Sequence, residues 1–231
     1  MGGVWVFPGG AVDAIDNLDA AHLAVTCSDG RMLPWNAAAA RELAEETGIW
    51  LFESGAVVTP RRPSDGAVFS YVLDRDERFA GDSLRYFANW ITPVPLPVRF
   101  DTRFFAATVP EDVDPIVDGI ELVEDEWIRP CHALKRADVG EWYVAFPTRK
   151  VLEFLGAFKS TAELGESIGV QVEVDPIQPR LVVAEGHIEI LMPDDPGFIE
   201  AAEGEADPDL QSTLERIIRS GTETHPEIGS P

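Results

Sequence analysis

Three closely spaced glutamates, Glu42, Glu45 and Glu46, are the residues of this chain best suited to chemistry. On a helix, positions i, i+3 and i+4 share one face within an arc of about 100°. Like charges at this spacing cost a helix roughly 0.2–0.5 kcal/mol per pair. A hard divalent cation explains the arrangement better than stability does, because Mg²⁺ and Mn²⁺ prefer carboxylate oxygens. A solvated acidic helix face is the alternative.

A helix and a preceding turn must position these carboxylates. The segment Asn36–Thr47 predicts a helix, with Asn36 as the N-cap, a run of alanines, and Gly48 just past the C-terminus. Glu45 and Glu46 then lie at the end where the helix dipole disfavours anions. Upstream, Val4–Phe7 predicts a strand that runs into a tight turn at Pro8, Gly9 and Gly10.

The rest of the chain predicts a mixture of helices and strands. Residues 11–35 are expected to form a loop or a partly ordered insertion. Extended structure is expected at 50–58, a helix at 67–82, strands at 84–92, 99–109 and 119–128, a helix at 147–158, a short helix after Ser160, and a hairpin at 180–192. Residues 194–209 contain seven acids and no Lys or Arg, which predicts an exposed, largely disordered tail.

Two of these segments together resemble the Nudix box. Arg41-Glu42-Leu43, one residue, Glu45-Glu46, one residue, and Gly48-Ile49 resemble its second half, and Phe7-Pro8-Gly9-Gly10 resembles its opening strand and turn. The resemblance implies an α+β Nudix fold, with a mixed β-sheet sandwiched between α-helices. It also implies a metal-dependent hydrolase that splits the diphosphate of a nucleoside-diphosphate derivative.

The box departs from the usual pattern in two respects. Gly10 and Arg41 are separated by 30 residues, so an insertion splits the box, and its first acid is either Asp16 or Asp13. The chain also starts almost at the strand before Gly9, so the N-terminal strand of a Nudix fold is apparently lacking. A missing strand would expose a sheet edge, and we therefore expect the native product to begin upstream.

The insertion resembles the branch of the family that contains the peroxisomal acyl-CoA diphosphatases of mammals. Segments 90–105, 121–134 and 147–160 fit the same branch. The prediction is a Nudix domain over residues 1–193, with residues 11–35 inserted in the box, and a flexible acidic tail over 194–231.

The resemblance assigns roles to individual residues. Glu46 and Glu42 would be the principal metal ligands, and Glu45 a further ligand or supporting acid. Arg41 would orient the glutamates by ion pairing. The family often adds an acid from a later loop or strand, for which Glu121 is the first candidate, with Glu124 behind it. An acid at a strand edge is the equally weighted alternative for Glu121.

Substrate contacts are predicted at four positions. Gly9 and Gly10 would lie beside the substrate in the opening turn. Arg99 and Arg103 share a strand face with Asp101, so they either hold phosphates or pair with Asp101; the pairing is slightly favoured. Arg61 and Arg62 could also meet phosphate, but a solvated loop is the favoured interpretation.

The composition limits the partners. A formal charge of −23 disfavours nucleic acid, and no apolar run approaches the roughly 20 residues that span a membrane. Two cysteines without metal-ligand spacing favour a cytoplasmic chain with reduced thiols.

The resemblance favours coenzyme A (CoA) or an acyl-CoA as substrate, with 3′,5′-ADP and 4′-phosphopantetheine or its acyl form as products. Two alternatives stay open: a Nudix pyrophosphatase acting on NADH or ADP-ribose, and a catalytically silent Nudix-like binding module. A homodimer is also left open.

Overall fold

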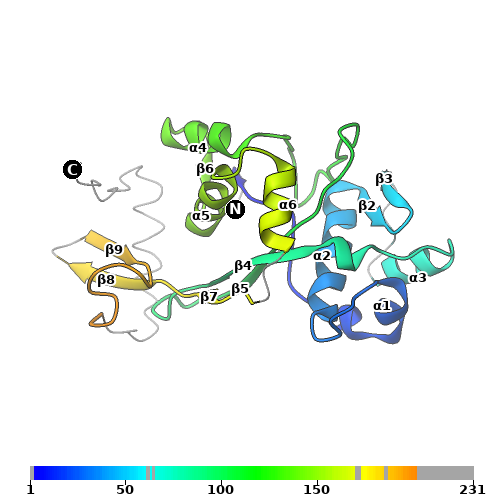
Figure 1. Cartoon of the computed structure of the whole chain (residues 1–231), viewed down its shortest axis with the longest axis horizontal. Helices are drawn as coiled ribbons and strands as arrows, with labels where there is room; N and C mark the ends of the chain where they lie inside the picture. The colour runs from blue at the N-terminus through cyan, green and yellow to red at the C-terminus, as the bar shows by residue number, and fades with distance from the viewer. Residues whose placement is uncertain (1–2, 61–62, 64–65, 170–172, 185–186, 202–231) are drawn as a thin grey trace. The chain divides into compact units, whose positions relative to one another are not determined.

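The computed structural model describes residues 3–60, 63, 66–169, 173–184 and 187–201 (Figure 1). The chain divides into two compact units. The first combines Met1–Phe87 with Phe104–Val172, and the second combines Ala88–Arg103 with Glu173–Pro231. The predicted contacts Arg61 and Arg62, and most of the predicted tail, lie outside the described residues. The domain boundaries proposed from sequence stay a prediction.

The N-terminal part of the first unit surrounds one long helix. Its elements are a short 3-10 helix (Ala14–Asn17), α1 (Asp19–Ala24), α2 (Leu33–Thr47), β2 (Ile49–Phe52), β3 (Gly55–Val58), α3 (Val68–Leu73) and a second 3-10 helix (Gly81–Ser83). β2 and β3 form an antiparallel hairpin, with Ile49 opposite Val58 and Phe52 opposite Gly55. The predicted extended segment 50–58 is thereby confirmed. The helix predicted over 67–82 is confirmed only for Val68–Leu73, because residues 74–80 form turns and irregular structure.

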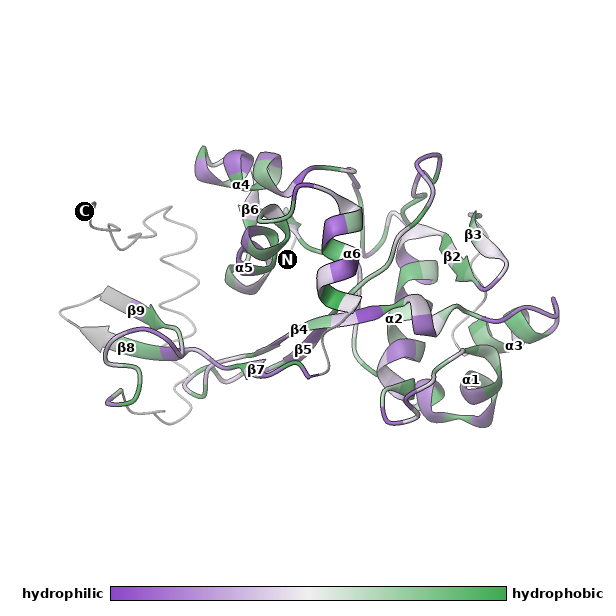
Figure 2. Ribbon diagram, viewed as in Figure 1, coloured by the Kyte–Doolittle hydropathy of each residue, from purple (hydrophilic) through white to green (hydrophobic). Residues whose placement is uncertain are grey.

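The main core lies between α2 and β2. All four residues of β2 are buried, and Figure 2 shows that hydrophobic residues predominate in this strand. Trp50 and Phe79 are fully buried, and their stacked rings have centroids 5.7 Å apart. The alanines of α2, including Ala37 and Ala44, are buried in the same cluster. This packing fixes the helix that carries the three glutamates.

Both ends of α2 are defined, but one differs from the prediction. The helix begins at Leu33, with Pro34 in its first turn, so Asn36 is not the N-cap. Asn36 lies inside the helix, and its side-chain amide instead donates to the Gly81 carbonyl at 2.9 Å. Gly48 ends the helix in the left-handed conformation, with φ of 70°, as predicted.

Of the two alternatives for residues 11–35, a loop or a partly ordered insertion, the loop is wrong. This segment contains a 3-10 helix, α1 and the start of α2. Ala21 and Ala24 of α1 are completely buried in the main core. Alanine contributes little to an amphipathic pattern, so the buried face of α1 gives a weak signal in the sequence.

The second half of the first unit is mainly helical. β1 (Val4–Trp5) pairs in parallel with β6 (Tyr143–Val144), and the helices are α4 (Pro130–Asp138), α5 (Phe146–Gly156) and α6 (Thr161–Gly169). Trp5 stacks on Trp142, with ring centroids 3.8 Å apart. The strand expected at Val4–Phe7 and the helices expected at 147–158 and after Ser160 are confirmed, whereas α4 was not predicted.

The strand predicted over 119–128 is wrong. Residues 107–129 contain no helix or strand. The Asp118 carboxylate accepts hydrogen bonds from the backbone N–H groups of Ile120, Glu121 and Leu122. These groups are therefore unavailable to a neighbouring strand, as is common where an aspartate competes with regular structure.

Strands β4 (Arg85–Ile91) and β5 (Asp101–Ala106) run from one unit into the other along the chain, and with β7 (Pro176–Ile177) they form a sheet in the order β5-β4-β7. β8 (Arg180–Ala184) and β9 (His187–Leu191) form an antiparallel hairpin. The strands expected at 84–92 and 99–109 and the hairpin at 180–192 are confirmed, although the hairpin turn lies outside the described residues. No helix of the described residues is long and apolar enough to cross a membrane.

Candidate active site

Arg41 joins the acids of α2 to the segment before that helix. Its side chain is buried, and its Nε and Nη2 atoms donate to the two carboxylate oxygens of Asp16, each at 2.9 Å. Its Nη1 atom donates to Glu42 at 2.8 Å and to Glu45 at 3.0 Å. One planar guanidinium therefore orients three carboxylates, which is the orienting role predicted for it.

Asp16 is the acid that pairs with the arginine. Its side chain is completely buried, and it also accepts the backbone N–H of Asp13 at 2.7 Å. Asp13 caps the 3-10 helix that carries Asp16. Of the two residues proposed as the first acid of the box, Asp13 therefore shapes the turn, and Asp16 reaches Arg41.

The opening turn of the box lies directly against the glutamates of α2. The backbone N–H of Gly9 donates to Glu46 Oε2 at 2.8 Å. A β-carbon on Gly10 would lie 2.3 Å from Glu42 Oε1, closer than non-bonded atoms can approach. A β-carbon at this position would displace the end of the Glu42 side chain, so glycine lets that carboxylate lie against the turn. The two halves of the box thus meet in space despite their separation in sequence.

The loop 107–129 adds two further acids near α2. The N–H of Ile116 donates to the Thr47 carbonyl at 2.7 Å, and the N–H of Asp118 donates to the Glu46 carbonyl at 3.0 Å. These are carbonyls that the last turn of a helix leaves without partners. The loop therefore docks on the end of α2 and brings Asp118 and Glu121 close enough for their charges to affect Glu46.

Asp118 was missed in the sequence analysis. Its signal was the dipeptide Asp118-Gly119, which is typical of a turn. The strand expected over 119–128 begins directly after Asp118, so this turn was not predicted.

The electrostatic field at Glu46 favours a proton or a cation. Only 7% of Glu46 is exposed. Burial raises the pKa of its carboxyl to about 7; the hydrogen bond from Gly9 opposes this rise, and the charges of Glu42, Glu121 and Asp118 add to it. Burial would lower the pKa of Arg41, but its hydrogen bonds and charge pairing with Asp16, Glu42 and Glu45 more than offset this and raise it.

The carboxylates of this site are of the type that binds a hard divalent cation, although their side chains are not already grouped around one metal position. Among the described residues, no three Asp, Glu, His or Cys side chains are already grouped as metal ligands. Glu42 and Glu45 point to Arg41, and Glu46 points to the Gly9 N–H. The donors are nonetheless carboxylate oxygens, the ligands that Mg²⁺ and Mn²⁺ prefer. Burial is the main cause of the raised pKa of Glu46, and the nearby charges of Glu42, Glu121 and Asp118 add to it; a bound cation would offset both effects.

The predicted phosphate contacts Arg99 and Arg103 belong to the second unit. Arg99 donates to the Thr92 carbonyl at 3.1 Å. Arg103 forms an ion pair with Asp101 at 3.2 Å, which matches the favoured structural interpretation. Their role in substrate binding stays a prediction.

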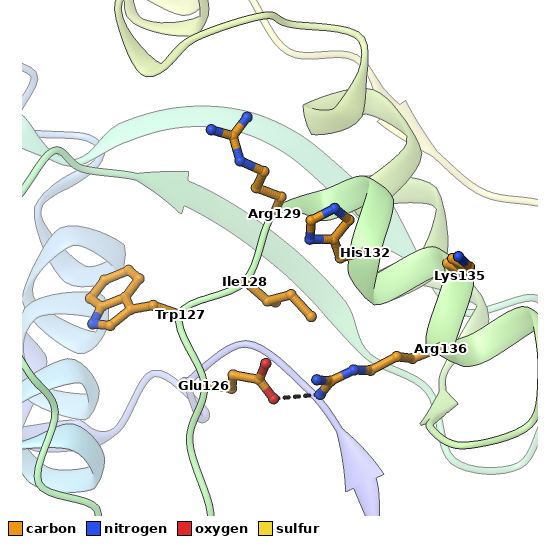
Figure 3. Close-up of a pocket in the computed structure, with 7 residues that line it drawn as sticks. All are labelled: Glu126, Trp127, Ile128, Arg129, His132, Lys135 and Arg136. Atoms are coloured by element: carbon orange, nitrogen blue, oxygen red, sulfur yellow. Dashed lines mark hydrogen bonds and ion pairs between the residues drawn. The ribbon is translucent and has the colours of Figure 1, made fainter.

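A separate pocket of about 410 Å³ lies at the start of α4 (Figure 3). Figure 3 shows the Glu126–Arg136 ion pair on one side of Ile128 and Arg129 and His132 on the other. None of the glutamates of α2 lines this pocket. The predicted chemistry therefore lies on α2 and the opening turn, outside this pocket.

Known Nudix hydrolases are similar to this chain in sequence and in fold. No family model matches the chain. A Caenorhabditis elegans protein named "Putative nudix hydrolase 7" is 28% identical over 210 residues, which cover 87% of this chain and 66% of that protein. The chain thus spans just under two thirds of the length of the curated relative it matches.

A solved structure gives the stronger match. The crystal structure of a Nudix hydrolase from Alicyclobacillus acidocaldarius has 30% sequence identity and a TM-score of 0.57 to this chain, over 75% of this chain and 83% of that one. The fold is the expected α+β Nudix fold. With the two halves of the box in contact at Gly9 and Glu46, this chain belongs to the Nudix hydrolase superfamily.

Proposed function

We propose that this chain hydrolyses the diphosphate bond of a nucleoside-diphosphate derivative in the presence of Mg²⁺ or Mn²⁺, and that CoA or an acyl-CoA is its substrate. The observation that carries the proposal is the contact between the two halves of the box, with Gly9 bonded to Glu46 and Arg41 bonded to Asp16, Glu42 and Glu45. This contact supports the proposal because it brings several carboxylates together, and carboxylate oxygens are the ligands that Mg²⁺ and Mn²⁺ prefer.

Each residue has a role in this reaction. Glu46 and Glu42 would hold the cation, with Glu45 as a further ligand or supporting acid. When bound, the cation would neutralise the diphosphate charge and lower the pKa of a water molecule. Arg41 keeps the glutamates oriented through its buried ion pairs. Glu121, whose negative charge contributes to the raised pKa of Glu46, is the candidate to accept the proton of the attacking water.

The reaction is balanced by water alone. The water oxygen forms a bond to one phosphorus, the bond from that phosphorus to the bridging oxygen breaks, and a carboxylate takes the proton. For CoA the products are 3′,5′-ADP and 4′-phosphopantetheine. A bound cation also resolves a charge conflict, because a chain of formal charge −23 would otherwise repel an anionic substrate.

The test is a substrate panel. The purified chain is incubated with CoA, an acyl-CoA, NADH and ADP-ribose, each with Mg²⁺, Mn²⁺ or EDTA, and the products are identified by mass. Glu46→Gln is compared with Glu53→Gln, a matched change at an exposed glutamate outside the site. Metal-dependent release of 3′,5′-ADP, lost in Glu46→Gln and retained in Glu53→Gln, is the expected result.

Other outcomes separate the parts of the proposal. Cleavage of NADH or ADP-ribose alone would retain the mechanism and overturn CoA as the substrate. Binding of a nucleotide without cleavage of any substrate would overturn the enzymatic proposal in favour of a binding module.

A further inference from the structure

The Asp118 carboxylate organises a short turn in the loop after β5. It accepts the backbone N–H groups of Ile120 at 3.1 Å, Glu121 at 3.1 Å and Leu122 at 2.9 Å. The Gly119 N–H closes the same turn by donating to the Leu122 carbonyl at 2.9 Å. Residues 118–122, called here the 118–122 turn, are therefore folded around one side chain.

This turn is also fixed to the helix that carries the proposed metal ligands. The Asp118 N–H donates to the Glu46 carbonyl at 3.0 Å, and Ile116 makes the equivalent bond to Thr47. Asp118 thus connects α2 to the turn. Its backbone N–H donates to the Glu46 carbonyl, and its side chain accepts the backbone N–H of Glu121. Through these bonds the position of Glu121 depends on the position of α2.

Apart from these backbone hydrogen bonds, little fixes the position of the Glu121 side chain. Its side chain is exposed, and within the described part of the chain neither of its carboxylate oxygens accepts a hydrogen bond. Its charge nonetheless acts on Glu46. The backbone turn is therefore the feature that keeps this carboxylate near the site.

We propose that Asp118 is a positioning residue, which holds Glu121 beside the carboxylates of α2 by accepting the N–H groups of the 118–122 turn. The proposal rests on the proposed function, in which Glu121 acts at the metal site. Asp118 acts through Glu121 and not on the substrate directly. Residues that orient a metal site in this way typically contribute 10–100-fold to metal affinity or activity.

A double-mutant cycle tests the dependence of one residue on the other. Asp118→Ala, Glu121→Gln and the double variant are compared in kcat and, without substrate, in affinity for Mn²⁺ measured by electron paramagnetic resonance. Each single change is expected to lower both quantities roughly 10–100-fold. The loss in the double variant should be well below the product of the two single losses, because Asp118 then has no Glu121 carboxylate to position; the charge of Asp118 itself, which also acts on Glu46, accounts for any remaining loss. Losses that multiply would overturn the proposal.

Amide hydrogen exchange separates positioning from misfolding. In Asp118→Ala the amides of Ile120, Glu121 and Leu122 should exchange faster, while those of α2 keep their protection. Unchanged exchange in the 118–122 turn would refute the proposal. Asp118→Asn keeps one carbonyl acceptor and should restore part of the protection and of the Mn²⁺ affinity.

Asp112→Ala is the control, because Asp112 is an exposed aspartate of the same loop whose side chain makes no hydrogen bond or ion pair with the residues that the structure describes. It should match the unmodified protein in all assays. If the unmodified protein cleaves no substrate, the proposed function fails, whereas the Mn²⁺ and exchange measurements still decide the role of Asp118.

Discussion

The buried Asp16–Arg41 pair offers the sharpest test of the fold, because the chain contains the same pair on its surface. In both pairs, Nε and Nη2 of an arginine donate to the two oxygens of an aspartate. The Asp16 and Arg41 side chains are 0% and 7% exposed, whereas those of Asp29 and Arg31 are 47% and 90% exposed. The two aspartates can therefore be changed to asparagine as matched variants that differ mainly in burial.

We expect Asp16→Asn to be strongly destabilising. Removing one partner of a buried ion pair costs about 3–5 kcal/mol, because the other charge is left buried and incompletely compensated. Arg41 keeps Glu42, Glu45 and the Ala11 carbonyl, so the lower end, about 3 kcal/mol, applies. For a chain of this size that loss lowers Tm by roughly 6–12 °C.

The measurement is urea unfolding of both variants, followed by tryptophan fluorescence at one pH. Asp29→Asn should leave the midpoint nearly unchanged, because both of its charges are in water. Equal effects of the two variants, or a loss below about 1 kcal/mol for Asp16→Asn, would refute the reasoning that burial gives the pair its importance.

Three further outcomes are expected. In EDTA, the free energy of unfolding should fall by up to about 3 kcal/mol as the pH rises from about 4.5 to 7. The folded chain binds the Glu46 proton with a pKa of about 7, and this stabilising contribution is lost as the pH rises through that value. Urea titrations of Glu46→Gln should lack this pH-dependent component. Gly10→Ala should displace the Glu42 carboxylate and weaken Mn²⁺ binding roughly 10-fold or more, whereas Gly30→Ala, in open space, should not; equal Mn²⁺ titrations would count against the close contact. Phe79→Ala should cost about 3–5 kcal/mol in thermal or urea unfolding, because it empties the centre of the main core; a loss under 1 kcal/mol would contradict that placement.

The parts of the site that depend on local spacing were predictable from the sequence. The shared helix face of the three glutamates, the end of α2 at Gly48 and the strand before the two glycines are all present. Each follows from helical periodicity or from glycine at a turn, which involve only a few adjacent residues.

The parts that depend on distant partners were not predictable. Asn36 has the chemistry of an N-cap, but inside the helix its amide nitrogen donates instead to the Gly81 carbonyl, 45 residues away. The strand expected over 119–128 failed because Asp118 takes the N–H groups that pairing would need. The choice between Asp13 and Asp16 also required the folded structure, since only the position of Arg41 distinguishes them.

Helix α4, which was not predicted, did leave a local signal in the sequence, with Pro130 in its first turn and Lys135 and Arg136 in its last.

The split box has a consequence for how this domain can change during evolution. Arg41 and the Gly9–Glu46 contact hold the opening turn against the glutamates. The chain between these two parts of the box forms helix α1, which packs in the main core. The exposed bend at Ser28–Arg31 lies between α1 and α2. Because doubling the length of a flexible loop costs only about 0.6 kcal/mol, residues inserted after Ser28, which is bonded to Asp82, should cost little stability and leave the carboxylates in place. The chemistry of the box therefore does not depend on the number of residues between its two halves.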